Sequence, residues 1–188
     1  MEMTNDNDMT RIVFEPIDID QLKPLITFAF EDDPELLSTY SLLNNPTLEQ
    51  SVDTNFNTIV EAFNSPVYCN GDDINIYRVM LDNDGYLQPI GFTVTVTNGD
   101  IPHDLFSFGI NVNYRSKKTV LKWLEGVKEL LGKYYAVTLH KNNTRAINLF
   151  LKNGFTSTNE GDKNVVTLFS NFKELIKKKS KILVSNGS

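Results

Sequence analysis

The sequence predicts a single mixed α/β domain, and three observations support this. Segments with the two-residue periodicity of strands fill the middle of the chain, residues 74–112, and turn signals separate them. Helical patterns precede this region, and a strand–helix–strand unit spans residues 104–140. We therefore expect an antiparallel meander followed by a right-handed crossover that joins two parallel strands. At 188 residues the chain is long enough to bury a substantial core.

The N-terminal part predicts one strand and three helical segments. Residues 11–17 have a strand pattern, and Asp18 with Gln21 forms a capping-box pattern ahead of the first helix. The acidic loop, residues 31–35, separates this helix from the next, and its carboxylates suit the positive end of a helix dipole. A third helix is expected after residue 45.

The remaining elements alternate between turn signals and regular patterns. Asp82–Gly85 and Asn98-Gly99 are turn sequences that predict hairpins. The longest amphipathic pattern begins at Ser116, and Gly132 is its expected stop. The predicted strands are Ile74–Leu81, Pro89–Thr97, Asp104–Val112, Tyr134–His140 and Asn164–Phe169, and a short helix after Asn143 ends at Gly154.

Charge divides the chain into a body and a tail. The net charge is −6 with a pI near 4.9, which disfavours a whole-surface nucleic-acid binder and suits a cationic ligand. Residues 173–188 nevertheless carry five lysines against one glutamate, which predicts a solvated basic helix with at most unspecific attraction for nucleic acid. We divide the chain into a flexible N-terminus, residues 1–10, a domain of residues 11–170 and a basic tail of residues 171–188.

Cysteine usage and hydropathy indicate a cytoplasmic protein. Cys69 is the single cysteine, so no disulfide within the chain is possible, and a half-buried apolar role is favoured over a reactive thiol. No apolar run is long enough to cross a bilayer, and the first ten residues are polar. We expect no membrane association and no metal site.

One segment carries a family motif. Residues 143–155 read N-T-R-A-I-N-L-F-L-K-N-G-F, which closely resembles the N-x-R-A-x-x-L-Y-x-x-x-G-F motif of the GNAT (Gcn5-related) N-acetyltransferases. The departure is Phe150, where the family usually has tyrosine. The resemblance implies the GNAT fold, which is a mostly antiparallel mixed sheet of six to seven strands with helices on both faces and a splayed pair of parallel strands.

A second segment resembles the part of this family that binds acetyl-coenzyme A. Residues 110–120, I-N-V-N-Y-R-S-K-K-T-V, are similar to V-x-x-x-Y-R-G-K-G-x-G/A. Ser116 and Lys118 stand where glycines are usual, and Val120 replaces the last small residue, so the backbone has less room to approach a phosphate. The resemblance, together with free N–H groups at a helix start, implies the following cofactor-binding residues: Phe108, Gly109, Ile110, Val112, Arg115, Ser116, Lys117, Lys118, Thr119, Val120, Asn143, Arg145 and Phe150.

Acetyl transfer to an amine also requires proton transfer and stabilisation of an oxyanion. Backbone N–H groups of residues 108–110 are the expected oxyanion donors, with Gly109 permitting a bulge. Asp104 is the first candidate for the general base, because it occupies the strand position at which the histone-acetyltransferase branch has a glutamate. His103 and His140 are the other candidates, and surface or strand-end roles are open for all three. Phe150 has no hydroxyl, so either Tyr114 or Tyr135 acts as the acid, or the thiolate leaves unassisted at a cost in rate.

Two functions agree with these residues. The first is an N-acetyltransferase that moves an acetyl group from acetyl-CoA directly to an amine, on a small cationic molecule or on a protein. The alternative is a catalytically inactive GNAT-fold module for binding or assembly, which includes a homodimer. The lost glycines and Phe150 favour the alternative, whereas Arg115, Asn143 and Arg145 favour the enzyme. If the protein is an enzyme, the acidic loop borders the acceptor site and attracts an ammonium group.

Overall fold

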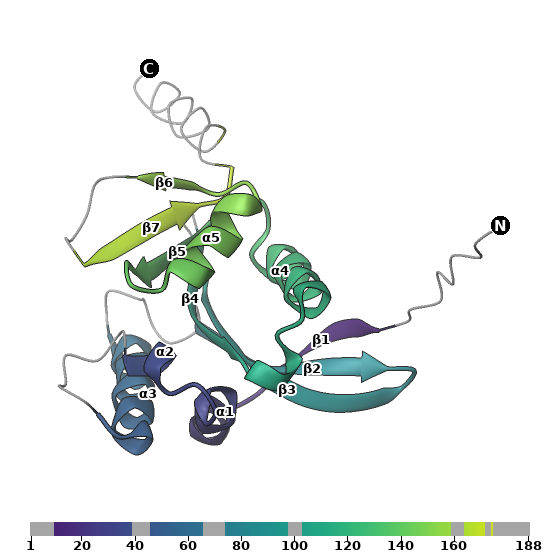
Figure 1. The fold of residues 1–188 in the computed structure, drawn as a ribbon, viewed down its shortest axis with the longest axis vertical. Coiled ribbons are helices and arrows are strands. Elements are labelled where there is room, and N and C mark those ends of the chain that lie inside the picture. Colours follow the sequence, from purple (N-terminus) through teal and green to yellow (C-terminus); the bar gives the residue numbers. More distant parts are fainter. Residues whose placement is uncertain are drawn as a thin grey trace.

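A mixed seven-stranded sheet forms the centre of the molecule, in the order β1-β2-β3-β4-β5-β7-β6 (Figure 1). The computed structural model describes residues 10–38, 46–65, 74–97, 103–158, 164–171 and 174. Within these residues the strands are β1 (Arg11–Pro16), β2 (Ile74–Asn83), β3 (Tyr86–Val96), β4 (His103–Ile110), β5 (Tyr135–His140), β6 (Thr156–Thr158) and β7 (Val165–Phe169). The helices are α1 (Leu22–Phe30), α2 (Glu35–Ser38), α3 (Leu48–Asn64), α4 (Lys117–Leu131) and α5 (Thr144–Lys152). The predicted Asn98-Gly99 turn, Cys69 and most of the basic tail lie outside the described residues.

The parallel strands β4 and β5 pair over a short distance and then separate. His103, Asp104 and Leu105 of β4 pair with residues 135–137 of β5, and β4 has no partner on this side beyond Leu105 among the described residues. All other neighbouring strands are antiparallel. The expected fold class is therefore confirmed, including the splayed parallel pair. We call the space between the separated strands the split.

The helices cover both faces of the sheet and build two apolar cores. α1, α2 and α3 pack on one face, where their cluster includes Ile26, Val52 and Phe92. α4 and α5 pack on the other face, around Trp123 and Phe150. The Trp123 indole Nε1 donates to Thr93 Oγ1 across 2.9 Å, and this bond ties α4 to the middle of the sheet.

The β2–β3 hairpin turns as its sequence predicts. Asp84 and Gly85 both have positive φ, 53° and 87°, as a two-residue type I′ turn requires. β3 starts at Tyr86, three residues before the predicted start at Pro89. Pro89 is tolerated because the β2–β3 register shifts beside it and leaves Ile90 without a partner on β2, and a bulge of this kind accommodates a residue without an N–H group.

β4 differs from the prediction in two details. Its bulge lies at Phe106, because Val94 pairs with Ser107 while Thr95 pairs with Leu105, so the expectation of a bulge at Gly109 was wrong. Glycine is required at position 109 for another reason: a Cβ there would lie 2.7 Å from the ring of Phe30 and 2.8 Å from that of Phe92.

β4 also ends at an earlier residue than the sequence predicts. The strand ends at Ile110, and Val112 belongs to a 3₁₀ turn, Val112–Tyr114. The side chain of Asn111 causes this change of direction. Its Nδ2 donates to the Phe28 carbonyl across 2.6 Å, while its Oδ1 accepts from the Asn113 amide.

Candidate functional site

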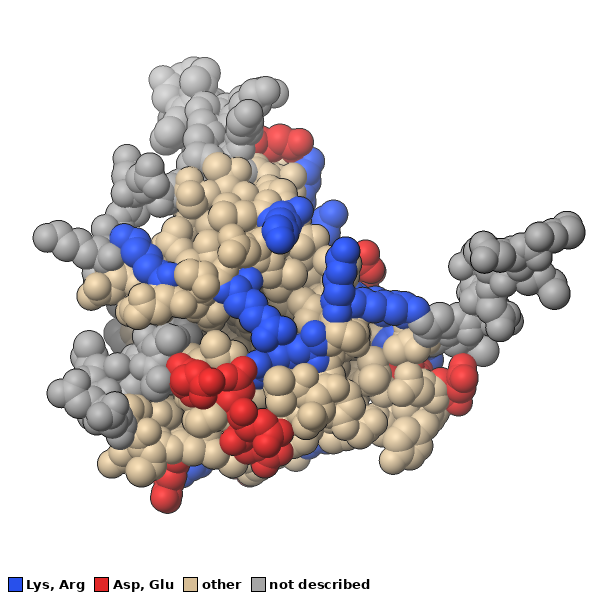
Figure 2. Space-filling model, in the orientation of Figure 1, with Lys and Arg blue, Asp and Glu red and all other residues tan. Residues whose placement is uncertain are grey.

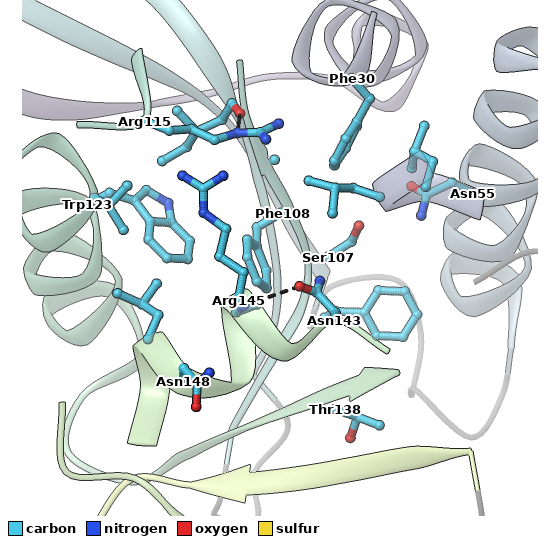
Figure 3. Close-up of a pocket in the computed structure, with 18 of the residues that line it drawn as sticks. Phe30, Asn55, Ser107, Phe108, Arg115, Trp123, Thr138, Asn143, Arg145 and Asn148 are labelled. Carbon is cyan, nitrogen blue, oxygen red and sulfur yellow. Dashed lines mark hydrogen bonds between the residues drawn. The ribbon is translucent and has the colours of Figure 1, made fainter. Parts of the chain in front are cut away.

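A cavity of about 960 Å³ passes through the split between β4 and β5. Its walls are the end of α1, α2 and α3 on one side and α4 and α5 on the other, with residues 106–110 of β4 between them. Figure 3 shows side chains from both sides directed into this space. The cavity therefore connects the two faces of the sheet at the point where the sheet is interrupted.

The edge of β4 that faces the split keeps part of its backbone groups free, although the Ile110 carbonyl accepts from Arg115 Nε. The Asn111 amide donates to the Ile90 carbonyl, so this pair is a hydrogen-bonded one, and by alternation Gly109 and Ser107 also bond to β3. The intervening residues, Phe108 and Ile110, then direct their backbone groups away from β3 and toward the split. An extended ligand can pair with this edge as an added strand.

The floor of the cavity is aromatic. The ring of Phe108 lies 5.0 Å from that of Trp123 and 5.9 Å from that of Phe150. Phe150 is fully buried and also packs on Phe155 at 4.9 Å. At the position where the family usually has tyrosine, this chain therefore has a core side chain beneath the cavity, and Phe150 does not line it.

Basic side chains line the half of the cavity between α4 and α5. Lys117, Arg145 and Lys152 are exposed, and no described residue forms an ion pair with any of them. Arg145 reaches from the first turn of α5 past Phe108 toward Arg115 (Figure 3). Asn143 holds this turn, because its Oδ1 accepts from the Ala146 amide across 3.2 Å. Figure 2 shows a run of basic side chains across the middle of this face.

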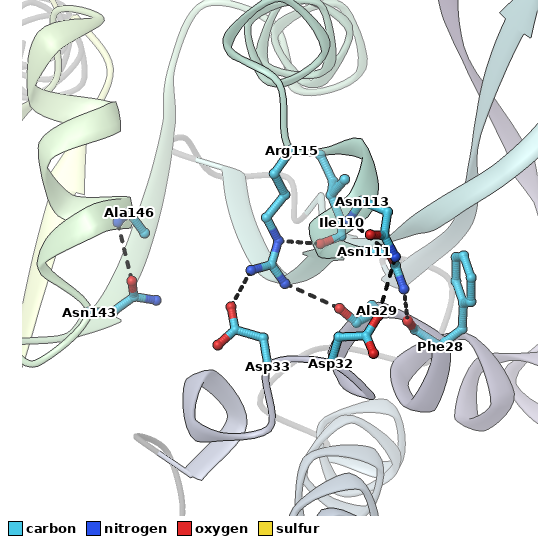
Figure 4. A network of polar contacts seen from close by, with 10 residues as sticks. All are labelled: Phe28, Ala29, Asp32, Asp33, Ile110, Asn111, Asn113, Arg115, Asn143 and Ala146. Atoms are coloured by element: carbon cyan, nitrogen blue, oxygen red, sulfur yellow. Dashed lines mark hydrogen bonds and ion pairs between the residues drawn. The ribbon is translucent and has the colours of Figure 1, made fainter.

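Arg115, predicted to bind the cofactor, bonds to protein groups in this structure (Figure 4). Its guanidinium donates to the carboxylate of Asp33 and to the carbonyl oxygens of Ala29 and Ile110. The ion pair is mostly shielded, since 11% of the Arg115 side chain and 19% of the Asp33 side chain are exposed. Together with Asn111, this network joins the end of α1 to the end of β4.

The start of α4 offers fewer free N–H groups than the family pattern implies. Ser116 caps the helix, and its Oγ accepts from the Thr119 amide across 3.1 Å. Lys117 and Val120 line the cavity, whereas Val112, Ser116, Lys118 and Thr119 are not among its lining residues. The side chain of Val120 lines the cavity and leaves it open.

The predicted acid and base residues do not gather around the cavity. Asp104, His140 and Tyr114 are all absent from its described lining. Asp104 lies where β4 still pairs with β5, and the Tyr114 hydroxyl accepts from Gln88 Nε2. His140 ends β5, and its Nδ1 accepts from the Asn142 amide. Their catalytic roles remain predictions.

The two alternative candidates are also placed elsewhere. His103 precedes Asp104 in the paired part of β4, and its Nδ1 is buried without a partner among the described residues. Tyr135 is buried in the core against Phe155, and burial raises the pKa of its hydroxyl, which weakens it as an acid. The described residues contain no cluster of His, Cys, Asp or Glu that could hold a metal ion.

The α3 wall of the cavity was not predicted from the sequence. Its polar residues are Ser51, Thr54, Asn55 and Thr58, which repeat at helical spacing on one face. In the sequence these four residues form a polar stripe along the predicted helix. The same residue types also occur on helix faces that contact only solvent, so the stripe alone does not indicate a binding site. Position beside the split is what distinguishes them.

Comparison with known proteins supports the fold. No protein-family model and no curated protein matches the sequence. Among solved structures, an acetyltransferase from Thermus thermophilus has a TM-score of 0.60 at 14% identity, covering 85% of this chain and 96% of that one. A probable acetyltransferase of the GNAT family from Chromobacterium violaceum has a TM-score of 0.52 at 16% identity, covering 85% and 81%. This chain has the GNAT fold.

A third GNAT-fold structure contains a ligand. The PaiA N-acetyltransferase from Thermoplasma acidophilum, in complex with coenzyme A, has a TM-score of 0.54 at 21% identity, over 85% of this chain and 98% of that one. Because these sequence identities are low, the comparisons show a similarity of fold alone. Within the described residues, no helix is both long and apolar enough to span a membrane.

The network of Arg115 gives a test of how the site is held. Replacing Asp33 by Ala should lower the free energy of unfolding by about 2 kcal/mol, because a largely buried guanidinium loses its charged partner. The double variant Asp33→Ala/Arg115→Ala should lose clearly less than the sum of the two single variants. Urea denaturation of all four proteins measures this coupling, and strictly additive losses would contradict it.

Asp104 gives a test based on pH. Partial burial raises the pKa of its carboxyl above the ordinary value, and the nearby His103 partly offsets this. An ionised Asp104 therefore costs stability, and that cost grows as pH rises through the raised pKa. Asp104→Asn should raise the melting temperature at pH 7, with the gain shrinking to nothing below about pH 3. The exposed Glu129→Gln is the control, and a variant that melts lower than the wild type at pH 7 would rule out the assignment.

Proposed function

We propose that this protein is an acyl-CoA-dependent N-acyltransferase that transfers an acetyl group to an amine. The observation that carries the proposal is the cavity that follows the unpaired edge of β4 through the split. On one side of this edge lie basic side chains and the start of α4, and on the other lies a separate, uncharged wall. Such a channel accommodates two substrates that approach one point from opposite faces of the sheet.

The residues present suit acetyl-CoA. The backbone groups of Phe108 and the N–H group of Ile110 would pair with the amide-containing arm, while Lys117 and Arg145 would attract the phosphates. Bound acetyl-CoA supplies an acyl thioester, whose C–S bond breaks as the amine nitrogen forms the new C–N bond, with the amine proton passing to solvent or to the departing thiolate.

The chain contributes mainly orientation and backbone dipoles. The N–H groups directed into the split would stabilise negative charge on the carbonyl oxygen, beside the aromatic floor of the cavity. The described lining contains no Asp, Glu or His. None of the described lining residues would therefore act as a side-chain base, and in our proposal the amine reaches the site already uncharged.

A second function has specific support. Ser116 takes up a helix N–H that a glycine would leave free, and Phe150 provides no hydroxyl. Both features favour a GNAT-fold module that binds CoA or a partner without catalysis. Binding of CoA without acyl transfer to any amine would identify this module.

Calorimetry with CoA and acetyl-CoA tests the proposal. We expect micromolar binding that weakens about tenfold in Arg145→Gln, because one charge-assisted contact with a phosphate is worth roughly 1.4 kcal/mol. Lys117→Gln should weaken binding in the same direction. Lys141→Gln is the matched control, since it removes a positive charge from an exposed residue outside the cavity lining.

The outcomes are distinct. Loss of affinity in the cavity variants, with Lys141→Gln unchanged, supports binding at the split. Absence of binding at millimolar CoA would refute the proposal. Equal affinities for all three variants would place the ligand elsewhere on the protein.

A further inference from the structure

The half of the cavity beside α1, α2 and α3 presents apolar side chains. Those that line it are Phe30, Leu36, Leu37, Ile59 and Phe106. Leu37 and Ile59 are almost fully buried, but Leu36 and Phe106 are only half-buried. Leu36 and Phe106 therefore keep apolar surface that a ligand in the cavity can cover.

The threonines of α3 that line this half are compatible with an apolar ligand. Thr54 Oγ1 donates its hydrogen to the Gln50 carbonyl across 2.8 Å, and Thr58 Oγ1 donates to the Thr54 carbonyl across 2.9 Å. Each hydroxyl hydrogen is thus already bonded within the helix. A hydrocarbon chain can lie against these two residues without leaving a hydroxyl hydrogen unpaired.

This apolar half begins at the part of β4 where a thioester would lie. The ring of Phe30 packs on Gly109, since a Cβ at Gly109 would lie 2.7 Å from that ring, and Figure 3 shows Phe30 directed from α1 toward β4. Gly109 lies between Phe108 and Ile110, whose N–H groups are directed into the split and would hold the thioester carbonyl. An acyl carbon held there is next to the apolar half.

The distribution of charge orients the donor in the cavity. The charged residues of the described lining are Arg115, Lys117, Arg145 and Lys152, and the described lining residues of α1, α2 and α3 are all uncharged. The phosphates of CoA would therefore lie at the basic half. Because the acyl group is at the opposite end of CoA from the phosphates, it would extend past β4 into the apolar half.

An acetyl group uses little of the space available there. The cavity has a volume of about 960 Å³ over its two halves, and acetyl adds a single methyl group to the thioester carbonyl. A longer hydrocarbon chain would cover the accessible parts of Leu36 and Phe106. Each methylene group that becomes fully buried strengthens binding by about fourfold.

We propose that the apolar half of the cavity binds the hydrocarbon chain of the acyl group, so that the protein prefers acyl-CoA with a saturated chain longer than acetyl, such as hexanoyl-CoA. This rests on the proposed function and extends it from acetyl to longer acyl groups. The bonds that break and form are those of acetyl transfer, C–S and C–N. Only the group attached to the carbonyl carbon changes.

Calorimetry with acetyl-CoA, butyryl-CoA and hexanoyl-CoA tests this preference without requiring a known acceptor. We expect the affinity to rise along the series, with hexanoyl-CoA binding at least about tenfold more tightly than acetyl-CoA, because added methylene groups are buried. CoA itself should bind about as well as acetyl-CoA, since the basic half provides most of the contacts that the two ligands share.

The first variant removes apolar contact from the acyl chain. Leu36→Ala should weaken the binding of hexanoyl-CoA about fivefold and leave that of acetyl-CoA unchanged, because only the longer chain reaches this side chain. Leu151→Ala is the matched control. Leu151 is an exposed leucine of α5 outside the described cavity lining, so its loss should change neither affinity.

The second variant fills the same half from a different helix. Thr54 is half-buried and lines the cavity, so Thr54→Phe should occupy the space for the chain and reduce the affinity for hexanoyl-CoA to that for acetyl-CoA. Asn57→Phe is its control, because Asn57 is exposed on the same helix and outside the described lining. This control should retain the preference for hexanoyl-CoA.

Each outcome decides the inference. Equal affinities for acetyl-CoA and hexanoyl-CoA would overturn it while leaving the proposed transferase intact. A preference for hexanoyl-CoA that persists in both Leu36→Ala and Thr54→Phe would also overturn it, because the chain would then bind elsewhere. If neither CoA nor any of the acyl-CoA ligands binds, the proposed function fails and this inference fails with it.

Discussion

The early end of the β4–β5 ladder is the constraint on which the site depends. The two parallel strands pair through three residues each, and β4 then continues alongside β3 alone. Beyond this point the sheet has an unpaired internal edge, which a folded protein normally covers. The bulge at Phe106 lies next to the last paired residue, Leu105, and bulges bend a strand and increase its local twist. The cavity is the space that this separation leaves.

The surrounding elements maintain the separation and occupy the two sides differently. On one side, α4 and α5 pack through Trp123 and Phe150 and extend basic residues over the opening. On the other side, the Arg115–Asp33 network and Asn111 attach the end of α1 to the end of β4, so that α1–α3 stay against the split. In this chain, Arg115 contributes to architecture, and the charge presented to a ligand comes from Lys117, Arg145 and Lys152. The cavity through the split is thus retained although Arg115 bonds to protein groups.

Much of the fold could be predicted from the sequence, because its signals are local. The Asp84-Gly85 turn, the Asn143 cap and the spacing of the N-x-R-A motif each depend on residues close together in the chain, and all appear where expected. The position of the bulge depends on pairing between β3 and β4, which sequence periodicity does not encode. The polar stripe of α3 becomes a wall only because the split lies opposite it. The same limit applies to Asp104. Its position along the strand, compared with the family, predicted a general base, but the structure places it in the paired part of β4.

Hydrogen exchange of the β4 amides tests the central claim most directly. The account predicts that the amides of Phe108 and Ile110 exchange readily in the free protein and become protected when CoA is added, because a bound ligand pairs with this edge. The intervening Gly109, already bonded to β3, should change little. Unchanged exchange at Phe108 and Ile110 under saturating CoA, or strong protection of both in the free protein, would show that the edge is not the binding surface.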